Sequence, residues 1–253
     1  MVDSAKIMSD SKLYLEADEL DNGSVLSQMA ATIADEIRNP LAGIASTVSL
    51  LKEDMPDRMD DAKLKTIDSC IRRIDSFIED LYLLTRPISP GFMLIELTEF
   101  VRQVVEQYFS SENINYHFIS DDEKMSANID MILLQNALYN ILDNSVYALG
   151  QDGEMWISVE RETTDHDDNK ARITIRDTGT GMDKKVFRNL FVPFFTTKHE
   201  GRGLGLVIAR NYIHFHGGTI HIESEKNKGT LVKINLPIFA GGDDAGTWKY
   251  IGS

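Results

Sequence analysis

The sequence predicts an α+β protein of two domains, in which a helical hairpin precedes a larger domain of mixed helices and strands. Two observations predict this division. Apolar residues recur at steps of three and four in the first third of the 253-residue chain, whereas short alternating segments separated by turns dominate the rest. The hydrophobic content of 42% is enough for two modest cores.

The hairpin prediction depends on two apolar stripes with helical spacing, on either side of Met55-Pro56-Asp57. The stripes consist of Met29, Ile33, Ile37, Leu41, Ile44, Val48 and Leu51, and of Ile67, Ile71, Ile74, Ile78 and Leu81. A single hairpin buries such stripes poorly, so we expect two chains to pair into a four-helix bundle. The expected domains are a leader or signal-input linker at 1–23, this dimerisation hairpin at 24–88, the mixed domain at 89–238 and a tail at 239–253.

The leader is polar and acidic, and we expect either the end of a signal-input helix or a disordered segment. In the mixed domain, alternation predicts strands at 92–97, 113–119, 154–160, 172–176, 219–223 and 231–236. Helices are expected at 99–109, 133–149 and 204–216, with Thr98 as the N-cap of the first.

Two glycine clusters predict a nucleotide-binding site in this domain. They are Asp177-Thr178-Gly179-Thr180-Gly181 and Gly201-Arg202-Gly203-Leu204-Gly205-Leu206. Glycine lets the backbone approach phosphate oxygens, and the first amides of a helix point donors at an anion. The second cluster runs directly into a predicted helix, so both conditions meet there. Either cluster alone would be weak evidence, since loops use glycine for turns.

Asn136, Asn140 and Asn144 recur every four residues and therefore share one face of a predicted helix. Neutral amide oxygens suit a magnesium ion that keeps water and phosphate ligands, although a solvated polar face is the alternative. Between the glycine clusters lies Phe-Val-Pro-Phe-Phe-Thr-Thr-Lys at 191–198. Its aromatics would anchor a loop whose Thr and Lys reach a phosphate, or would simply belong to the core.

In this order, with Gly229-Thr230 at the end, these motifs resemble the catalytic domain of sensor histidine kinases, within the wider family of Hsp90, the MutL proteins and type II topoisomerases. The resemblance covers roughly residues 91–237 and implies an α/β sandwich that binds ATP and Mg²⁺. It implies that Asp177 accepts a hydrogen bond from the adenine amino group, that Asn144 holds the metal and that Asn140 lies near the phosphates. The other implied binding residues are Gly179, Gly181, Thr197, Lys198, Arg202, Gly203, Leu204, Gly205 and Thr230.

Residues 34–44 resemble the phosphoacceptor segment of a histidine kinase, except that Asp35 stands where that family has its histidine. The resemblance assigns Glu36 an acid/base role, and Asn39 follows one turn later. A carboxylate beside Glu36 is already anionic and would repel the γ-phosphoryl group. We therefore expect ordinary histidine autophosphorylation at this position to be blocked.

Three interpretations of Asp35 remain open. In the first, Asp35 is an introduced change in an otherwise competent kinase. In the second, the chain is a natural relative that binds ATP and a partner without autokinase activity. In the third, Asp35 itself takes phosphate. The third is disfavoured because only Arg38 would offset two carboxylates. Asn39 keeps a further activity open, because the resemblance gives it a part in dephosphorylating a partner response regulator. An ATPase clamp like Hsp90 is disfavoured, because those proteins lack the segment at 34–44.

The formal charge of −14 makes nucleic acid and anionic membranes poor partners. It also opposes the approach of ATP, so Lys198, Arg202 and Arg210 would have to compensate locally. Lys184, Lys185 and Arg188 are expected to form a solvated surface instead. No run of about 18 apolar residues is present, so we expect a cytoplasmic protein or the cytoplasmic part of a longer one. The resemblance implies that the partner of the expected homodimer is a response regulator receiver domain.

Overall fold

The computed structural model describes residues 13–16, 37, 39–44, 46–47, 50, 65–67, 69–72, 74, 91–110, 114–121, 124–150, 153–162, 170–198 and 201–239. The chain divides into two compact units. One consists of residues 20–88, and the other of residues 1–19 and 89–253. Among the helices of the described part, none is both long and apolar enough to cross a membrane.

The first unit is helical wherever it is described, both between residues 37 and 50 and between residues 65 and 74. The two segments approach each other closely at a glycine, since a Cβ added to Gly43 would lie 3.1 Å from the Sγ of Cys70. Thr47 is buried in the first segment, and its hydroxyl donates to the Gly43 carbonyl at 2.8 Å. The helical part of the predicted fold is confirmed. The turn at 55–57 lies outside the described residues, and pairing with a second chain stays a prediction.

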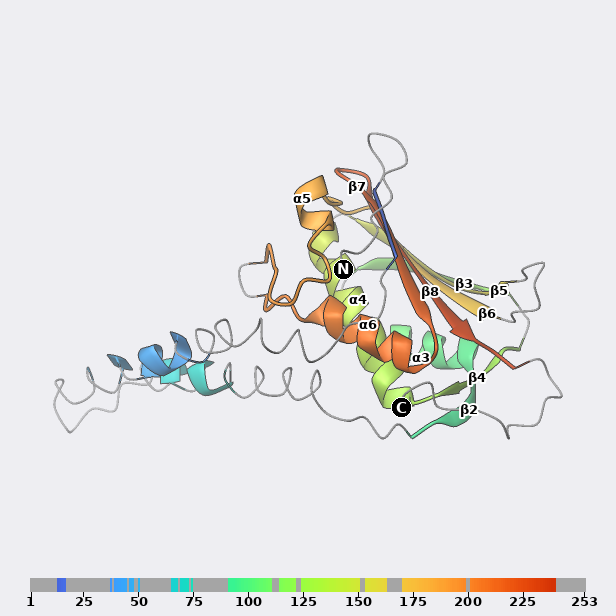
Figure 1. Cartoon of the computed structure of the whole chain (residues 1–253), viewed down its shortest axis with the longest axis horizontal. Coiled ribbons are helices and arrows are strands. Elements are labelled where there is room, and N and C mark those ends of the chain that lie inside the picture. Colours follow the sequence, from blue (N-terminus) through green and yellow to red (C-terminus); the bar gives the residue numbers. More distant parts are fainter. Residues whose placement is uncertain are drawn as a thin grey trace. The chain divides into compact units, whose positions relative to one another are not determined.

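The second unit contains a six-stranded sheet, in the order β1-β7-β8-β6-β5-β3 (Figure 1). The strands are β1 (Leu13–Glu16), β3 (Asn115–Ser120), β5 (Glu154–Glu162), β6 (Lys170–Asp177), β7 (Thr219–Glu225) and β8 (Gly229–Pro237). All neighbours are antiparallel except β3 and β5, which run parallel. A separate antiparallel pair joins β2 (Met93–Glu96) to β4 (Ser126–Ile129).

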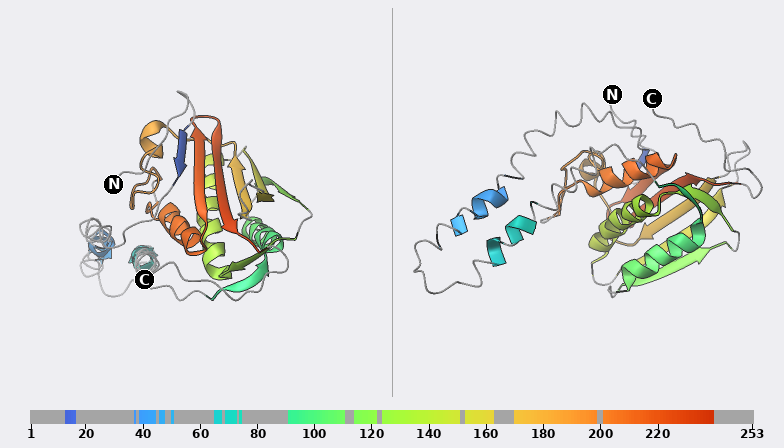
Figure 2. Two further views of the ribbon diagram at one scale, coloured as in Figure 1. Left: turned by 45° about the vertical axis from the view of Figure 1, so that its right-hand side comes forward. Right: turned by 90° about the horizontal axis from the view of Figure 1, so that it is seen from below.

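Three helices cover one face of this sheet, as the views in Figures 1 and 2 agree. They are α3 (Leu97–Phe109), α4 (Met131–Leu149) and α6 (Gly205–Phe215). Alternation along the strands sends Ile157, Ile173 and Ile234 to the helix-covered face, where each is fully buried. Burying such side chains against helices stabilises the fold by roughly 1.5–3 kcal/mol each. The predicted α/β sandwich is therefore confirmed.

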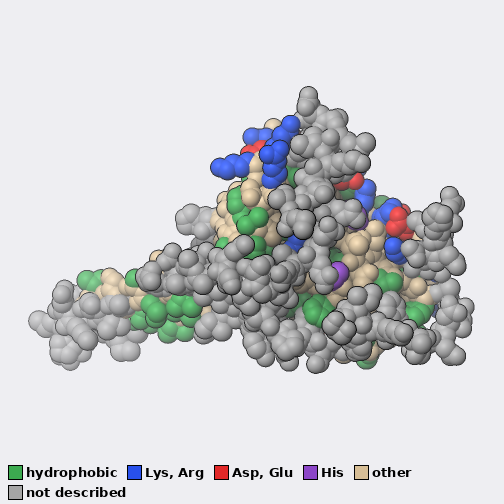
Figure 3. Space-filling view, in the orientation of Figure 1, with side chains coloured by type: hydrophobic (Ala, Val, Ile, Leu, Met, Phe, Trp, Pro, Cys, Tyr) green, Lys and Arg blue, Asp and Glu red, His purple; other side chains and the backbone are tan. Residues whose placement is uncertain are grey.

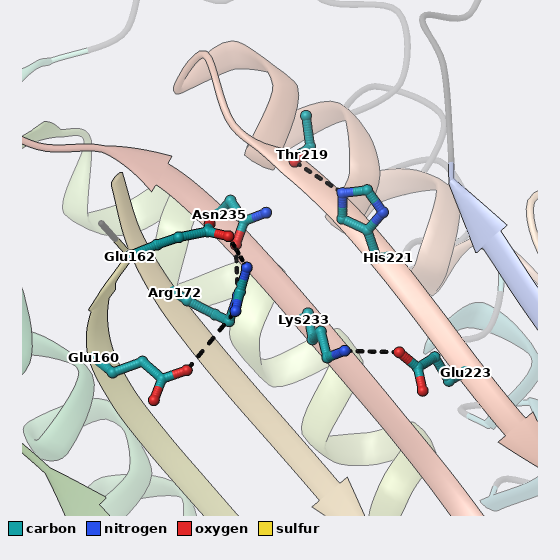
Figure 4. Close-up of polar contacts among 8 residues, drawn as sticks. All are labelled: Glu160, Glu162, Arg172, Thr219, His221, Glu223, Lys233 and Asn235. Atoms are coloured by element: carbon teal, nitrogen blue, oxygen red, sulfur yellow. Dashed lines mark hydrogen bonds and ion pairs between the residues drawn. The ribbon is translucent and has the colours of Figure 1, made fainter. Parts of the chain in front are cut away.

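The opposite face of the sheet is polar and carries its own cross-strand contacts (Figure 4). Arg172 of β6 contacts Glu162 of β5, and its Nε donates to Asn235 of β8 at 3.2 Å. Lys233 of β8 donates to Glu223 of β7 at 2.7 Å. A strand with one buried and one solvated face reads as alternating apolar and polar residues, which is the pattern that predicted these strands.

Three elements were not predicted, namely β1, β4 and the short α5 (Lys184–Phe187). Residues 13–16 were expected to be helical or disordered, but they form an edge strand because β7 offers them an antiparallel partner. Lys and Arg side chains gather over α5 (Figure 3), where Lys184, Lys185 and Arg188 are exposed, as expected for a solvated surface.

The N-cap prediction for α3 was wrong. Glu96, not Thr98, caps the helix: its carboxylate accepts from the amides of Thr98 at 3.2 Å and Glu99 at 2.7 Å. The helix begins immediately after β2, two residues before the expected start, so the last strand residue serves as the cap.

His216 joins the N-terminal end of α4 to the C-terminal end of α6. Its Nε2 accepts from the amide of Asp130, the N-cap of α4, at 3.0 Å, and its Nδ1 lies 2.6 Å from the Tyr212 carbonyl in α6. These partners require a neutral ring that donates from Nδ1, and burial lowers the pKa of His216 accordingly. The two helices that carry the predicted site residues are thus fixed to each other.

Candidate nucleotide-binding site

The centre of the candidate site is Asp177, the last residue of β6, which is only 2% exposed. Its Oδ1 accepts from the amides of Gly179 at 2.9 Å and Thr230 at 3.1 Å. Ser145 of α4 adds a side-chain hydrogen bond. Burial raises the pKa of Asp177, and these three hydrogen bonds oppose the rise because they favour the ionised form. The result is a buried carboxylate in a fixed orientation.

Glycines surround this carboxylate because the backbone approaches too closely for any side chain. Gly181 has φ +58°, and a Cβ there would lie 2.0 Å from the Glu225 carbonyl oxygen. A Cβ on Gly229, at φ +98°, would lie 2.0 Å from the Asp177 carbonyl oxygen. A Cβ on Gly179 would lie 2.6 Å from the main-chain carbonyl of Ala148 in α4. The Asp-x-Gly-x-Gly motif is thus held between α4 and the β7–β8 turn.

The asparagine stripe lies half-buried on α4. The Asn140 side-chain nitrogen donates to the Asn136 carbonyl at 2.9 Å, and that of Asn144 donates to the Asn140 carbonyl at 2.8 Å. Because the nitrogens are bonded to the helix, the amide oxygens of Asn140 and Asn144 are the groups left to coordinate a ligand. A Cβ on Gly205 would lie 2.6 Å from the Asn140 Oδ1, so the start of α6 adjoins the stripe.

The N-terminus of α6 offers main-chain donors at this point. Leu204 is its N-cap and makes no side-chain capping bond, so the first-turn amides are not satisfied by a cap. The side chain of Leu204 is buried in the core, at 1% exposure, so only its main chain can contribute to binding. Gly203 has φ +69°, and its carbonyl accepts from the Phe194 amide at 3.0 Å. Residues 191–198, which we call the phenylalanine segment, thereby fix the main chain just before α6.

Lys198 contacts α4 from the end of that segment. Its Nζ donates to the Asp143 carbonyl at 3.3 Å and lies 4.7 Å from the centre of the Tyr147 ring. Burial lowers the pKa of Lys198, and the Asp143 carboxylate opposes the change. Thr197 is exposed and Arg202 half-buried. The described structure therefore brings Lys198 to the helix that carries the asparagines.

The predicted catalytic residues lie in the other unit. Asp35 and Glu36 fall outside the described residues, whereas Asn39 is an exposed helical residue.

Sequence reasoning missed Ser145 and Tyr147. Ser145 had a signal, since Leu134, Leu138, Ile141 and Ser145 form one stripe at steps of three and four. All four are buried, and a hydroxyl in a core stripe requires a hydrogen-bond partner. Tyr147 had no comparable signal.

The donor set fits magnesium bound mainly through a nucleotide. Within the described ranges no group of three or more His, Cys, Asp or Glu side chains could hold a metal by itself. The asparagine oxygens are hard ligands of the kind that Mg²⁺ accepts when phosphates and water complete its shell.

Two families match the chain in succession. Residues 25–90 match the "His Kinase A (phospho-acceptor) domain", and residues 129–239 match the "Histidine kinase-, DNA gyrase B-, and HSP90-like ATPase". Sporulation kinase C of Bacillus subtilis is 34% identical over 220 residues, which are 85% of this chain and 50% of that protein. The histidine-protein kinase AtoS of Escherichia coli is 32% identical, over 85% of this chain and 35% of its own length. The chain thus spans half or less of these relatives.

Solved structures agree with the fold. The nucleotide-free catalytic domain of histidine kinase ThkA is 31% identical with a TM-score of 0.50, covering 58% of this chain and 95% of that domain. The match to ThkA in its complex with the response regulator TrrA covers 93% of this chain and 78% of the ThkA chain, with a TM-score of 0.68 at 21% identity. Because two histidine kinase domain models match the chain and the ThkA catalytic domain, of which 95% is covered, is 31% identical, the chain belongs to the histidine kinase family.

Proposed function

We propose that this chain binds MgATP at the site formed by β6, α4 and α6, as the kinase core of a two-component signalling protein. The observation that carries the proposal is the buried, oriented carboxylate of Asp177. An ionised carboxylate only accepts hydrogen bonds, so it suits the exocyclic amine of adenine. We call Asp177, Ser145, Gly179 and Thr230 the adenine end of the site.

The phosphate end comprises Asn140, Asn144, Lys198 and the first turn of α6. We assign the amides of Gly203 and Gly205 and the main chain of Leu204 to the triphosphate, with Thr197 and Arg202 nearby. Gly181 shapes the turn after Asp177. Asn144 would hold Mg²⁺, whose charge neutralises the phosphates during transfer. The hydrogen bond from Asn144 to the helix supports this role, since it directs the amide oxygen toward a ligand.

In a competent core, the γ-phosphoryl group would pass in line to the phosphoacceptor helix of a homodimer and then to a receiver domain. The known complex of ThkA with TrrA supports a response regulator as partner. Here Asp35 occupies the acceptor position beside Glu36. We propose that the carboxylate of Asp35 blocks autophosphorylation, because it places a negative charge where a neutral nucleophile is required.

Intact-protein mass after incubation with MgATP tests this proposal, on the chain and on Asp35→His side by side. We expect the His variant alone to gain a phosphate. Phosphate on the unchanged chain would contradict the block. No gain on either chain would favour a nucleotide-gated binding protein without autokinase activity.

A second activity, dephosphorylation of a partner regulator, is favoured by the exposed position of Asn39 on its helix. The resemblance gives this residue a part in placing the attacking water, a step that does not need the acceptor imidazole. The chain should shorten the lifetime of a phosphorylated cognate regulator, and Asn39→Ala should not. An unchanged lifetime with the original chain would rule the activity out.

A further inference from the structure

We infer that Tyr147 is a positioning residue, whose ring holds the ammonium of Lys198 at the phosphate end before nucleotide arrives. The inference rests on the proposed function, because Lys198 is assigned there to the phosphates. Neither the glycine clusters nor the asparagine stripe identifies Tyr147.

Lys198 is held at both ends of its length. Its amide donates to the Thr196 Oγ1 at 3.0 Å, which turns the main chain at the end of the phenylalanine segment. Its Nζ lies 4.7 Å from the Tyr147 ring centre and donates to the Asp143 carbonyl at 3.3 Å. A cation at this distance from a ring face is attracted by the ring quadrupole. The long side chain is therefore directed to one place on α4.

That place is the turn of α4 that carries the proposed magnesium ligand. Tyr147 follows Asn144 by three residues and Asp143 by four, so all three surround the same turn. Tyr147 is 57% exposed, so its ring is accessible at the surface. The contact of this ring is with a cation, the Lys198 ammonium.

The contacts also preserve the charge that a phosphate needs. Both groups that touch the Lys198 Nζ, the ring and the main-chain carbonyl, are electrically neutral. The carboxylate of Asp143 accepts from the Tyr108 hydroxyl at 2.5 Å and acts on the ammonium only through space, without a direct ion pair. The direct contacts that order the ammonium are therefore both neutral. Ordering a lysine in advance removes part of the conformational entropy that binding would otherwise cost.

Titration with ATP and with adenosine, in the presence of Mg²⁺, tests the inference on the full chain. Tyr147→Leu should weaken ATP binding by about two- to fivefold, the size of an exposed cation–π contact, and leave adenosine binding unchanged. Tyr147→Phe keeps the ring and should bind ATP like the original chain. Phe215→Leu is the matched control, an exposed aromatic at the opposite end of α6 from Gly205.

A double-mutant cycle tests whether Tyr147 acts through Lys198. In a Lys198→Met background, Tyr147→Leu should have no further effect on ATP affinity, because the cation that the ring holds is gone. Equal losses for ATP and adenosine, or tighter ATP binding by Tyr147→Leu, would overturn the inference while leaving the ATP site in place. No ATP binding by the original chain would overturn the proposed function and this inference together.

Discussion

The two ends of the proposed ATP site are built in opposite ways. At the adenine end, Asp177 is 2% exposed and is held by main-chain amides and by buried Ser145. At the phosphate end, half-buried Lys198 contacts exposed Tyr147 through its long side chain. In the proposed site, base selection would thus depend on groups fixed in the core, and phosphate recognition on long side chains that hold each other in place.

Burial disfavours the charge at both ends. It raises the pKa of the Asp177 carboxyl and lowers the pKa of the Lys198 ammonium. The adenine end counters this with donors fixed by the fold, and the phosphate end with the nearby Asp143 carboxylate. This difference predicts that substitutions at the adenine end reduce ATP affinity more than substitutions at the phosphate end.

The largest expected effect comes from Asp177→Asn. The amide would present a donor to the adenine amine and would lose a charge-assisted acceptor for two main-chain amides, so we expect ATP affinity to fall by about 100-fold or more. Calorimetric titration measures the loss, and circular dichroism of the variant checks that the fold is kept. Unchanged affinity would remove Asp177 from the site.

The next effect concerns the glycine turn that orients Asp177. Gly181→Ala meets the Glu225 carbonyl oxygen at 2.0 Å, whereas Gly217→Ala, at a similar positive φ of +67°, meets no atom closer than 3.6 Å, which is an ordinary contact. Strain at positive φ costs both variants about 1–2 kcal/mol of unfolding free energy. The clash should cost Gly181→Ala about 2 kcal/mol more, because the backbone must move. Urea unfolding followed by circular dichroism compares the pair, and equal losses would show that the turn yields freely.

The pH dependence of ATP affinity separates the two ends. Asp177 must be ionised, so affinity falls as the pH falls through its raised pKa; Lys198 must be protonated, so affinity falls as the pH rises through its lowered pKa. Ser145→Ala removes a hydrogen bond that lowers the Asp177 pKa, so the acid limb should move to higher pH, with affinity reduced about two- to tenfold there.

Lys198→Arg should move only the alkaline limb, to higher pH, because arginine stays protonated. Comparison with the original chain at each pH cancels the titration of ATP itself. If the acid limb of the affinity profile does not move in Ser145→Ala, then Ser145 does not influence the pKa of Asp177.

The smallest effect should come from the polar face of the sheet, which belongs to neither end. Lys233→Met removes the ion pair with Glu223, whose side chains are 33% and 12% exposed, and should cost less than about 1 kcal/mol of unfolding free energy. ATP affinity should not change. A loss of affinity here would mean that the two ends do not contain the whole site.

Much of the adenine end could be predicted from the sequence because its determinants are local. The glycines are required by backbone approach, and Asp177 stands at the end of an alternating strand. Ser145 escaped notice although it stands in a core stripe, because its partner lies 32 positions later in the chain. The contact between Tyr147 and Lys198 had no signal, because nothing in either segment specifies the other.

The sequence by itself determined the helices of the first unit, the strands that alternate, the asparagine face of α4 and the glycine turns, since periodicity and φ depend on neighbouring residues. Only the tertiary structure decided that residues 13–16 pair with β7, that His216 joins α4 to α6 and that Lys198 meets Tyr147. Each of these depends on segments distant in the chain meeting in space, and local patterns do not encode such meetings.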